Sequence, residues 1–290
     1  IEEFRAMVPL TAYEDYADVL LLKKEDMLPD KPIIWIQTTW EGGKHPIKVA
    51  PYTSGMLKTY KNNILTCLMM ATSKGRGSFD IGIGDTFLYG LAPLPYITGL
   101  IPLGLSDELH IEFLPPVDEA VNMTFSERNK KGFKMGLGKG IDFVSMSIAS
   151  LSEGGKKGGS FLKKLFTMPP SMTLRYLKAK KQCEKEGRGL MPKDLFRLKG
   201  FLCAGTDNRC YKDDLEELWG IRPVEVFAGT EPSFIGTETW NRNGLYFFPD
   251  ACFYEFIPET EMYKNLDDPS YVPRTICMDE VAAGEVYEIV

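Results

Sequence analysis

The sequence predicts an α/β fold in which mixed sheets are flanked by helices. Val224–Phe227 is a short run of mainly apolar, β-branched residues that stops at Ala228 and Gly229, as a buried parallel strand does. Upstream, Lys199–Ala204 is typical of a strand and Lys212–Trp219 of a helix, and the spacing of the three segments suits a parallel crossover. With 290 residues, 44% of them hydrophobic, the chain can bury the core of one large or two ordinary domains.

The N-terminal part of the chain supplies two more strands and a helix. Ile33–Gln37 and Ile47–Tyr52 are predicted to be strands on either side of the polar, glycine-bearing segment Thr38–Pro46. A helix should follow, capped by Thr53 or Ser54, because apolar residues then recur at helical spacing on one face. These apolar residues are Met56, Tyr60, Ile64 and Leu68.

Residues 79–115 are punctuated by glycine and proline, which favours several short strands. Within them, residues 86–105 carry no charged side chain, but three prolines and three glycines would break a bilayer-spanning helix. We therefore expect a buried strand–turn–strand passage there. Farther on, Ile141–Val144 is predicted to be a strand, Ser147–Ser152 a helix, and Met172–Glu186 a helix with a solvated basic face.

Two features bear on domain organisation. The segment 153–160, EGGKKGGS, has the composition of a flexible loop tip or of a joint between subdomains. The chain begins without Met inside a helix-like pattern, and it stops at an alternating strand, Gly284–Val290, with no strand after it to pair with. We therefore expect residues 1–290 to be part of one large domain that is truncated at both ends.

Composition argues against several classes of protein. A net charge of −6 is unlike that of a nucleic-acid binder, and we expect neither nucleic acid nor membrane as a partner. Six cysteines without a C-x-x-C spacing favour free thiols in a reducing, cytoplasmic setting. Two histidines are too few for a histidine-rich zinc site. The chain has no G-x-S-x-G elbow, no G-x-x-x-x-G-K-[ST] loop and no intact G-x-G-x-x-G.

The polar segment between the first two predicted strands is a candidate phosphate-binding loop. Its glycines let backbone N–H groups turn toward anionic oxygens, its hydroxyls donate hydrogen bonds, and its lysines neutralise charge. The candidate residues are Thr38, Thr39, Gly42, Gly43, Lys44 and Lys48. An ordinary exposed hairpin with turn glycines is the alternative.

A second candidate follows the strand Val224–Phe227. Open α/β sheets bind ligands beyond the carboxyl ends of their strands, so Thr230 and Glu231 would lie at a crevice, with Gly229 leaving room for a ligand. A carboxylate in that place suits a cation, and Glu231 would hold Mg²⁺ against phosphates on the upstream loop. The alternative is a strand that simply ends in a helix cap.

Several stretches of the chain resemble the Gretchen-Hagen-three family of auxin-responsive acyl-acid amido synthetases, and in particular its bacterial members. The stretches are FRAMVPLTAYEDY (4–16), KVAPYT (48–53), KGFLCAGTD (199–207), YK (211–212), LWGIRP (218–223), FAGTE (227–231) and FYEFIP (253–258). The likeness is spread over essentially the whole chain, and no single motif carries it.

This resemblance implies both a fold and a reaction. The family belongs to the adenylate-forming superfamily of acyl-CoA synthetases and luciferases, so the chain would be its large N-terminal domain. Family members use ATP and Mg²⁺ to turn a small carboxylic acid into an acyl-adenylate, and pass the acyl group to an amine, typically that of an amino acid. By position, Lys48 and Glu231 would be catalytic, and Thr230 and Glu231 would match the family's strand-end Ser/Thr-Glu. Gly205, Thr206 and Asp207 would border the adenine or acyl pocket.

Aromatic residues near the C-terminal end are candidates for an acyl-pocket wall, although core packing is the alternative for each. They are Trp240, Tyr246, Phe247 and Phe253.

The chain departs from the family pattern in two places. Trp40 and Glu41 interrupt the family's Ser-Gly-Thr-Thr/Ser-Gly loop, and an anion beside triphosphate oxygens would repel them. The downstream Tyr-Arg-x-Gly-Asp motif and the mobile C-terminal domain are absent, so this fragment should not turn over alone. Two alternatives stay open: an acyl-CoA or acyl-carrier ligase, and a non-catalytic homologue with a decayed phosphate loop.

Overall fold

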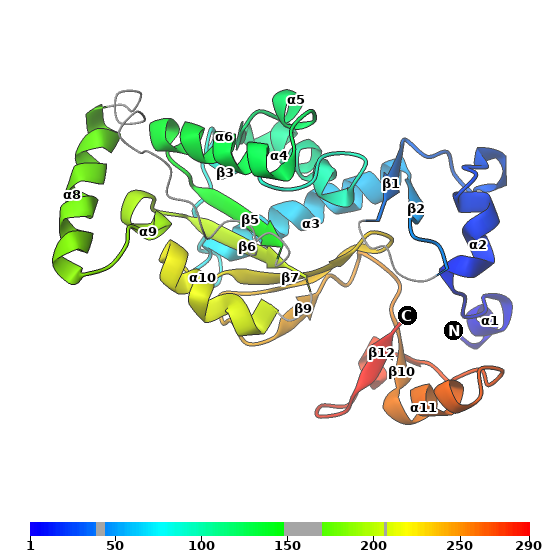
Figure 1. Cartoon of the computed structure of the whole chain (residues 1–290). Coiled ribbons are helices and arrows are strands. Elements are labelled where there is room, and N and C mark those ends of the chain that lie inside the picture. Colours follow the sequence, from blue (N-terminus) through cyan, green and yellow to red (C-terminus); the bar gives the residue numbers. More distant parts are fainter. Residues whose placement is uncertain (39–43, 148–169, 206–207) are drawn as a thin grey trace. The chain divides into compact units, whose positions relative to one another are not determined.

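The computed structural model describes residues 1–38, 44–147, 170–205 and 208–290 (Figure 1). The chain divides into two compact units. The smaller unit consists of Ile1–Pro29 and Cys252–Val290, and the larger one is Asp30–Ala251. The predicted joint at 153–160 lies outside the described residues.

A seven-stranded mixed sheet forms the centre of the larger unit, in the order β4-β3-β5-β6-β7-β8-β9. The first five strands of this order are parallel, and β8 runs antiparallel to both of its neighbours. The strands are β3 Thr86–Leu88, β4 Glu112–Leu114, β5 Phe143–Ser147, β6 Gly200–Ala204, β7 Val224–Gly229, β8 Ser233–Glu238 and β9 Leu245–Phe247. The predicted α/β fold with a mixed sheet is confirmed, including the strand–helix–strand unit β6-α10-β7.

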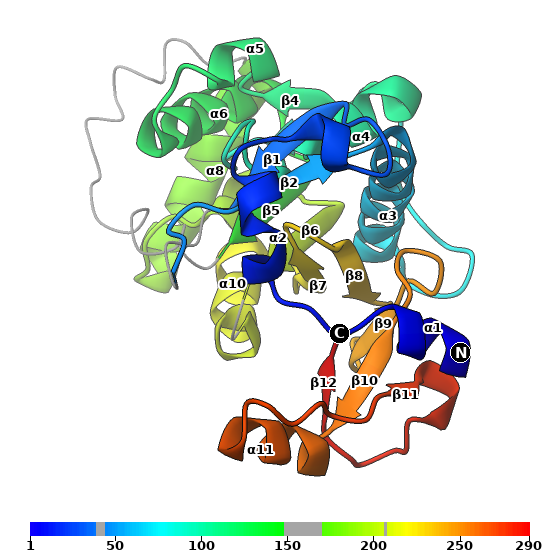
Figure 2. The ribbon, with the colours of Figure 1, turned by 90° about the vertical axis from the view of Figure 1, so that its right-hand side faces the viewer.

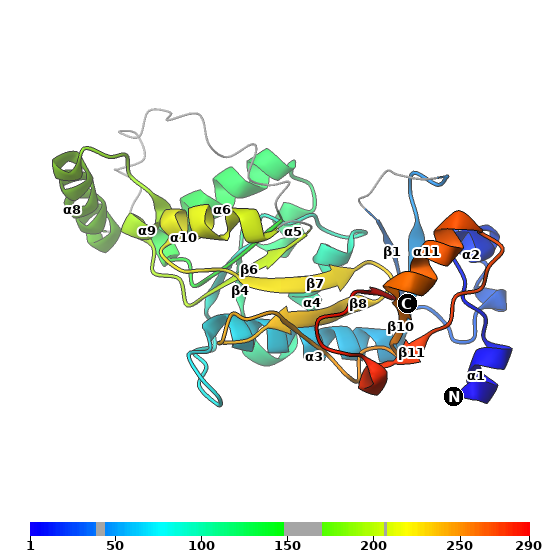
Figure 3. The ribbon, with the colours of Figure 1, turned by 90° about the horizontal axis from the view of Figure 1, so that it is seen from below.

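Helices cover both faces of this sheet, so that the larger unit has three layers (Figure 2). On one face, α3 (Ser54–Thr72) and α4 (Ile101–Leu109) enclose one hydrophobic core. On the other face, helices enclose a second core. These are α6 (Phe125–Lys139), α8 (Pro170–Glu186), α9 (Pro192–Leu195) and α10 (Lys212–Trp219). Figure 3 shows β7 and β8 between α6 and α10 on one side and α3 on the other.

Helix α3 follows the predicted pattern closely. The Thr53 hydroxyl caps it by accepting a hydrogen bond of 3.4 Å from the Met56 N–H, which satisfies one of the free donors of the first turn. Tyr60, Ile64 and Leu68 recur every four residues and are buried on its inner face. The helix therefore presents one apolar stripe to the sheet.

The prediction of several strands in 79–115 was wrong for its central part. Only β3 and β4 are strands there, and between them lie a 3-10 turn, η2 (Ile97–Leu100), and helix α4. Pro102 does not break α4, because it occupies the first turn, where the N–H that proline lacks would have no partner within the helix.

Within the described ranges, no helix has the length and apolar character needed to cross a bilayer. The predicted helix at 147–152 begins at the last residue of β5, and the rest of it lies outside the described residues.

Polar side chains fix the amino ends of the parallel strands. The Asp142 carboxylate accepts hydrogen bonds of 2.9 Å from both the backbone N–H and the hydroxyl of Thr86, which join β3 to β5. The Lys199 ammonium, which precedes β6, lies 2.8 Å from the Asp85 carboxylate. These contacts fix the alignment of the strands at their amino ends, away from the carboxyl ends.

The smaller unit has a three-stranded antiparallel sheet of order β11-β10-β12. Its elements are α1 Glu2–Met7, α2 Tyr13–Leu20, η1 Glu25–Met27, β10 Glu255–Pro258, α11 Glu259–Asp267, β11 Ile276–Cys277, η5 Met278–Glu280 and β12 Tyr287–Ile289. The Arg5 guanidinium lies 2.7 Å from the Glu255 carboxylate and ties α1 to β10. The strand predicted in Gly284–Val290 is β12, and its partner β10 precedes it in the sequence.

Helix α6 packs so closely on the sheet that one glycine is required. A Cβ atom on Gly132 would lie 2.4 Å from the carbonyl oxygen of Leu114 in β4, and a backbone atom cannot move aside cheaply. We expect Gly132→Ala to lower the free energy of unfolding by about 2 kcal/mol or more. Gly55→Ala in α3 is the matched control, since its Cβ would meet only the Thr53 hydroxyl, at 3.9 Å. Urea unfolding of both variants measures the difference, and an equal effect would contradict the close packing of α6.

Candidate functional site

The candidate phosphate loop is carried by a two-stranded hairpin of β1 (Ile34–Gln37) and β2 (Val49–Tyr52). At the base of the loop, the Thr38 N–H donates to the Lys48 carbonyl at 2.9 Å, and the Lys48 N–H donates to the Thr38 hydroxyl at 3.3 Å. Thr38 and Lys48 are therefore neighbours across the hairpin. Lys44 is exposed. Thr39, Gly42 and Gly43 lie outside the described residues, as do Trp40 and Glu41.

The second candidate is the turn between β7 and β8. Gly229 ends β7, and Thr230, Glu231 and Pro232 make the turn before Ser233 begins β8. The helix-cap alternative is therefore wrong, because the chain reverses directly into an antiparallel strand. The Glu231 side chain is exposed, and among the described residues its carboxylate has no hydrogen bond or ion pair. It is free to bind a ligand.

Ser233 gives this turn a second unusual feature that the sequence reading missed. Its φ of 66° lies in the left-handed region, which costs a non-glycine residue of the order of 1 kcal/mol. Its hydroxyl is buried and has no hydrogen-bond partner within the described part of the chain. Backbone strain of this kind recurs at functional sites. No signal in a single sequence marks a serine for this conformation.

A buried tyrosine joins the two candidates. The Tyr52 side chain at the end of β2 has no exposed surface, and its hydroxyl donates a hydrogen bond of 2.7 Å to the Thr230 carbonyl. The hairpin that carries the candidate loop is thus attached to the turn that carries Glu231. Figure 3 shows the arrowhead of β7 pointing toward the end of the sheet at which this hairpin lies.

Lys48 lies on the same side of the hairpin as Tyr52. Successive side chains of a strand alternate between faces, so Lys48, Ala50 and Tyr52 share one face, and Ala50 and Tyr52 are both buried. Tyr52 is the fourth residue after Lys48, which corresponds to about 13 Å along an extended backbone. Through Tyr52, the strand that follows Lys48 is thus in contact with the turn that carries Glu231.

The segment after β3 also lies beside the hairpin. The Gln37 N–H donates to the Pro95 carbonyl at 2.9 Å, and the Tyr60 hydroxyl donates to the Ile97 carbonyl at 3.1 Å. The hairpin and α3 therefore both hold residues 95–97 in place. The hairpin therefore contacts both the segment that follows β3 and the turn that follows β7.

Two further side chains near the end of β3 were not foreseen. Tyr89 follows β3, and its buried hydroxyl has no partner among the described residues. Burial raises the pKa of Tyr89 to about 12, although the Arg128 guanidinium opposes that rise. Arg128 in α6 is 6% exposed, and its Nη1 donates to the Met123 carbonyl. Its Nε has no partner within the described ranges, and burial lowers its pKa. Tyr89 and Arg128 come near each other only because α6 packs on β3, so the sequence gives no sign of their proximity.

The third predicted group follows β6. Gly205 has a φ of 130°, a conformation that favours glycine, and it lies beside β7 because Ala204 pairs with Val226. Thr206 and Asp207 lie outside the described residues. Of the proposed acyl-pocket aromatics, Tyr246 on β9 is half exposed, and Phe253 packs against Phe4 in the smaller unit, with 5.0 Å between ring centroids.

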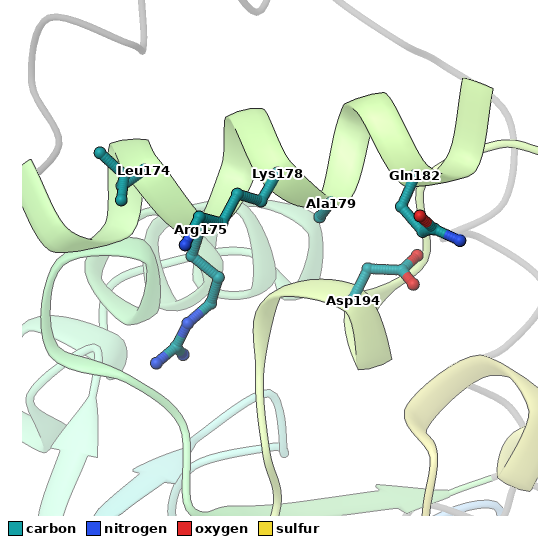
Figure 4. A pocket seen from close by; sticks show the side chains of 6 residues that line it. All are labelled: Leu174, Arg175, Lys178, Ala179, Gln182 and Asp194. Carbon is teal, nitrogen blue, oxygen red and sulfur yellow. The ribbon is translucent and has the colours of Figure 1, made fainter. Parts of the chain in front are cut away.

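A hollow of about 560 Å³ lies elsewhere in the larger unit, between α8 and α9 (Figure 4). It is lined by Leu174, Arg175, Lys178, Ala179, Gln182 and Asp194. Because α9 precedes the amino end of β6, this hollow is not part of the candidate site at the carboxyl ends of the strands.

The two buried tyrosines provide a matched test of this arrangement. Tyr52→Phe removes a partnered hydroxyl, so we expect it to lower the free energy of unfolding by about 1 kcal/mol. Tyr89→Phe removes an unpartnered hydroxyl and should leave the free energy of unfolding equal or higher. Burying that hydroxyl costs about 1–3 kcal/mol, and no hydrogen bond offsets the cost. Urea unfolding of both variants measures the two changes. A larger loss for Tyr89→Phe than for Tyr52→Phe would contradict the hydrogen-bond pattern described here.

Comparison with known proteins shows what the fold resembles. No protein-family model and no curated protein matches the chain. Among solved structures, the whole chain aligns with the acyl acid amido synthetase AtGH3.15 in complex with 2,4-DB, at a TM-score of 0.60 and 15% identity. The chain covers 56% of that protein. This likeness confirms the fold that the family resemblance implied.

Two other solved structures are less similar. ATP-bound MatB from Rhodopseudomonas palustris aligns with 81% of this chain at 12% identity and a TM-score of 0.45, over 37% of its own length. A malonyl-CoA ligase in a ternary product complex with methylmalonyl-CoA and AMP aligns with 78% of this chain at 13% identity and a TM-score of 0.40, over 39% of its own length. The chain thus spans about half, or less, of the structures that it resembles.

Proposed function

We propose that this chain belongs to an adenylate-forming ligase that activates a small carboxylic acid with ATP and Mg²⁺ and transfers the acyl group to an amine, as acyl acid amido synthetases do. On this proposal residues 1–290 are part of its large domain. The fold shared with AtGH3.15 supports the enzyme class, and the sequence stretches quoted above support the type of acceptor.

One observation carries the proposal. The hydrogen bond of 2.7 Å from Tyr52 to the Thr230 carbonyl attaches a hairpin rich in hydroxyls, glycines and lysines to a turn with a free carboxylate. Adenylation requires an in-line attack by a carboxylate oxygen on the α-phosphorus of ATP, so the phosphates and the departing pyrophosphate must be held and neutralised together. A cationic loop and an acidic turn at one sheet edge supply both functions.

The residues would divide the task by their chemistry. The backbone N–H groups of the loop and the Thr38 hydroxyl would donate to phosphate oxygens, while Lys48 would neutralise charge on the phosphate chain. Gly205 would border the nucleotide or the acid, since the backbone can approach a ligand closely where no side chain is present. In this scheme the contact between Tyr52 and Thr230 keeps the two halves of the site in register.

The residues at the turn fit a magnesium ion. Glu231 is exposed and has no competing partner in the described part of the chain, and Mg²⁺ in nucleotide sites is commonly held by one or two carboxylates together with phosphate oxygens and water. The ion would neutralise negative charge on the phosphates and the leaving pyrophosphate. Glu231 would hold it at the end of β7.

The proposal is tested first by the reaction itself. The protein that contains this chain should catalyse exchange of radiolabelled pyrophosphate into ATP when it is given the correct member of a panel of carboxylic acids. After adenylation, amino acids or coenzyme A are supplied in turn. Amide formation supports the proposal, whereas thioester formation would identify an acyl-CoA ligase. A protein that gives no signal with any acid and binds no ATP·Mg²⁺ would be a non-catalytic homologue.

A single substitution tests the acidic turn. Glu231→Gln keeps the size of the side chain but removes its charge, so we expect Mg²⁺-dependent ATP binding, measured by calorimetry, to weaken by at least about tenfold. The melting temperature should change little, since Glu231 is exposed and unpartnered. Glu217→Gln, an exposed acid on α10, is the control and should bind ATP normally. A large loss of thermal stability in Glu231→Gln would instead indicate a structural acid.

A further inference from the structure

Helix α8 carries a concentrated basic surface in an acidic chain. Five of its 17 residues are Lys or Arg and two are Glu, whereas the whole chain has a net charge of −6. On its inner face, Met172 belongs to the second core and Cys183 is also buried. The Arg175 guanidinium donates to the Leu195 carbonyl at 2.9 Å, which fixes α8 on α9. The helix is therefore firmly placed, at the end of the sheet away from the β1–β2 hairpin (Figures 1 and 3).

The outer side of α8 has a regular pattern. Leu174, Lys178, Lys181 and Lys185 follow one another at spacings of four, three and four residues, which puts them in one stripe along the helix. All four are exposed, and Leu174 is 58% exposed. Leu177 lies beside the stripe and is 50% exposed. The outer face of α8 thus combines two leucines with three lysines.

The acidic residues of α8 do not neutralise this face. Glu184 pairs with Lys180 at 3.8 Å, on the flank of the helix, and Glu186 pairs with Arg188 at 2.7 Å. Within the described ranges, the three lysines of the stripe have no ion-pair partner. Their positive charge is directed outward.

Helix α10, on the same face of the sheet, has the opposite charge. Leu215 and Trp219 are buried, and the outward positions are Asp213, Asp214, Glu216 and Glu217. The Arg222 guanidinium lies 2.6 Å from Asp213 and 2.9 Å from Glu216, so both of these acids have an ion-pair partner. Asp214 and Glu217, three residues apart, have no partner among the described residues. Tyr211, just before α10, is 41% exposed.

The hollow beside α8 has a lining that suits an aromatic side chain such as that of the exposed Tyr211. Figure 4 shows the side chains of Leu174, Arg175, Lys178 and Ala179 on α8, which all line the hollow. An aromatic ring fits such a site well, because leucine and alanine provide apolar contact and a guanidinium can stack on the ring. The hollow is lined by two cations, Arg175 and Lys178, and by Asp194, which is already paired with Arg188. The chain therefore carries both a hollow with net positive charge and an exposed tyrosine that precedes Asp214 and Glu217, acids that are unpaired in the described part of the chain.

We propose that two copies of this chain associate about a two-fold axis, with α8 of each copy lying on α10 of the other. Lys178, Lys181 and Lys185 then face Asp214 and Glu217 of the second copy, and Tyr211 of the second copy enters the hollow. A two-fold dimer forms this contact twice, which compensates for the weakness of each exposed ion pair. A nucleic acid or an anionic membrane fits less well, since the acids of α10 on the same face would repel either one.

A charge exchange between the two helices tests this dimer. Variant A is K178E/K181E/K185E and variant B is D214K/E217K. Each alone would oppose like charges at both contacts, so its dimer dissociation constant should rise by at least about tenfold. In an equimolar mixture, acidic α8 of A meets basic α10 of B, and basic α8 of B meets acidic α10 of A. Dimers should then return. All substituted side chains are exposed, and circular dichroism verifies that both variants are folded.

Sedimentation velocity provides the measurement. The unmodified chain should dimerise at concentrations up to about 100 µM in low salt, and the dimer should weaken in high salt because exposed charges are screened. The proposal is overturned if the unmodified chain stays monomeric, if either variant dimerises as well as the unmodified chain, or if the mixture stays monomeric. Should variant A fail to fold, K178Q/K181Q/K185Q replaces it, and dimerisation unchanged from the unmodified chain would be equally decisive.

Discussion

The hydrogen bond from the Tyr52 hydroxyl to the Thr230 carbonyl sets the geometry on which the candidate site depends. A two-stranded hairpin has too little buried surface to be stable alone in water, so β1 and β2 take their position from what they pack against. The Tyr52 ring meets Tyr60 edge-on, with centroids 6.5 Å apart, and Tyr60 in turn packs on Phe234 at 4.9 Å. The hairpin, α3 and β8 are thus joined through one row of buried aromatic rings.

The parallel arrangement of β3 to β7 determines where a ligand can bind. At the amino ends, side chains such as Asp142 and Lys199 are used for contacts between strands. At the carboxyl ends, small or polar residues follow the strands, including Gly205 after β6 and Thr230 after β7. Because every parallel strand ends at the same edge, residues far apart in sequence are collected there without any local signal.

Local patterns explain which parts of the fold could be predicted. The helical spacing in α3 and the cap at Thr53 are determined by neighbours in sequence, and the structure has them as expected. The strand predicted at Val224–Phe227 is present as β7, but it continues through Gly229 and Phe227 is 39% exposed. Helix α4 was missed because Pro102 suggests a break, although a proline in the first turn is compatible with a helix. The fold class could be predicted, since each strand and helix contributes an independent local signal.

The candidate site was predictable only in part, for the same reason. Glycines and lysines mark a phosphate loop by composition, and Glu231 is marked by its place after a strand. Tyr52, by contrast, looks like any buried strand residue, and its role depends on a contact across 178 positions of sequence. The influence of the Arg128 charge on Tyr89 likewise arises only when α6 packs on β3. Contacts between residues so far apart in sequence produce no periodic pattern from which they could be predicted.

The two sides of the β7–β8 turn are held by different residues, and this explains how the strained conformation of Ser233 persists. On one side Tyr52 holds the Thr230 carbonyl, and on the other the buried Asn63 amide of α3 donates to the Phe234 carbonyl at 3.4 Å. A residue in the left-handed region is stable only when its surroundings over-determine it, and two anchors that flank the turn meet that condition. Glu231 lies between the anchors, so its backbone is fixed while its carboxylate stays exposed. On the proposed function, Glu231 would then bind a cation with little reorganisation, because its backbone is rigid and its carboxylate is exposed.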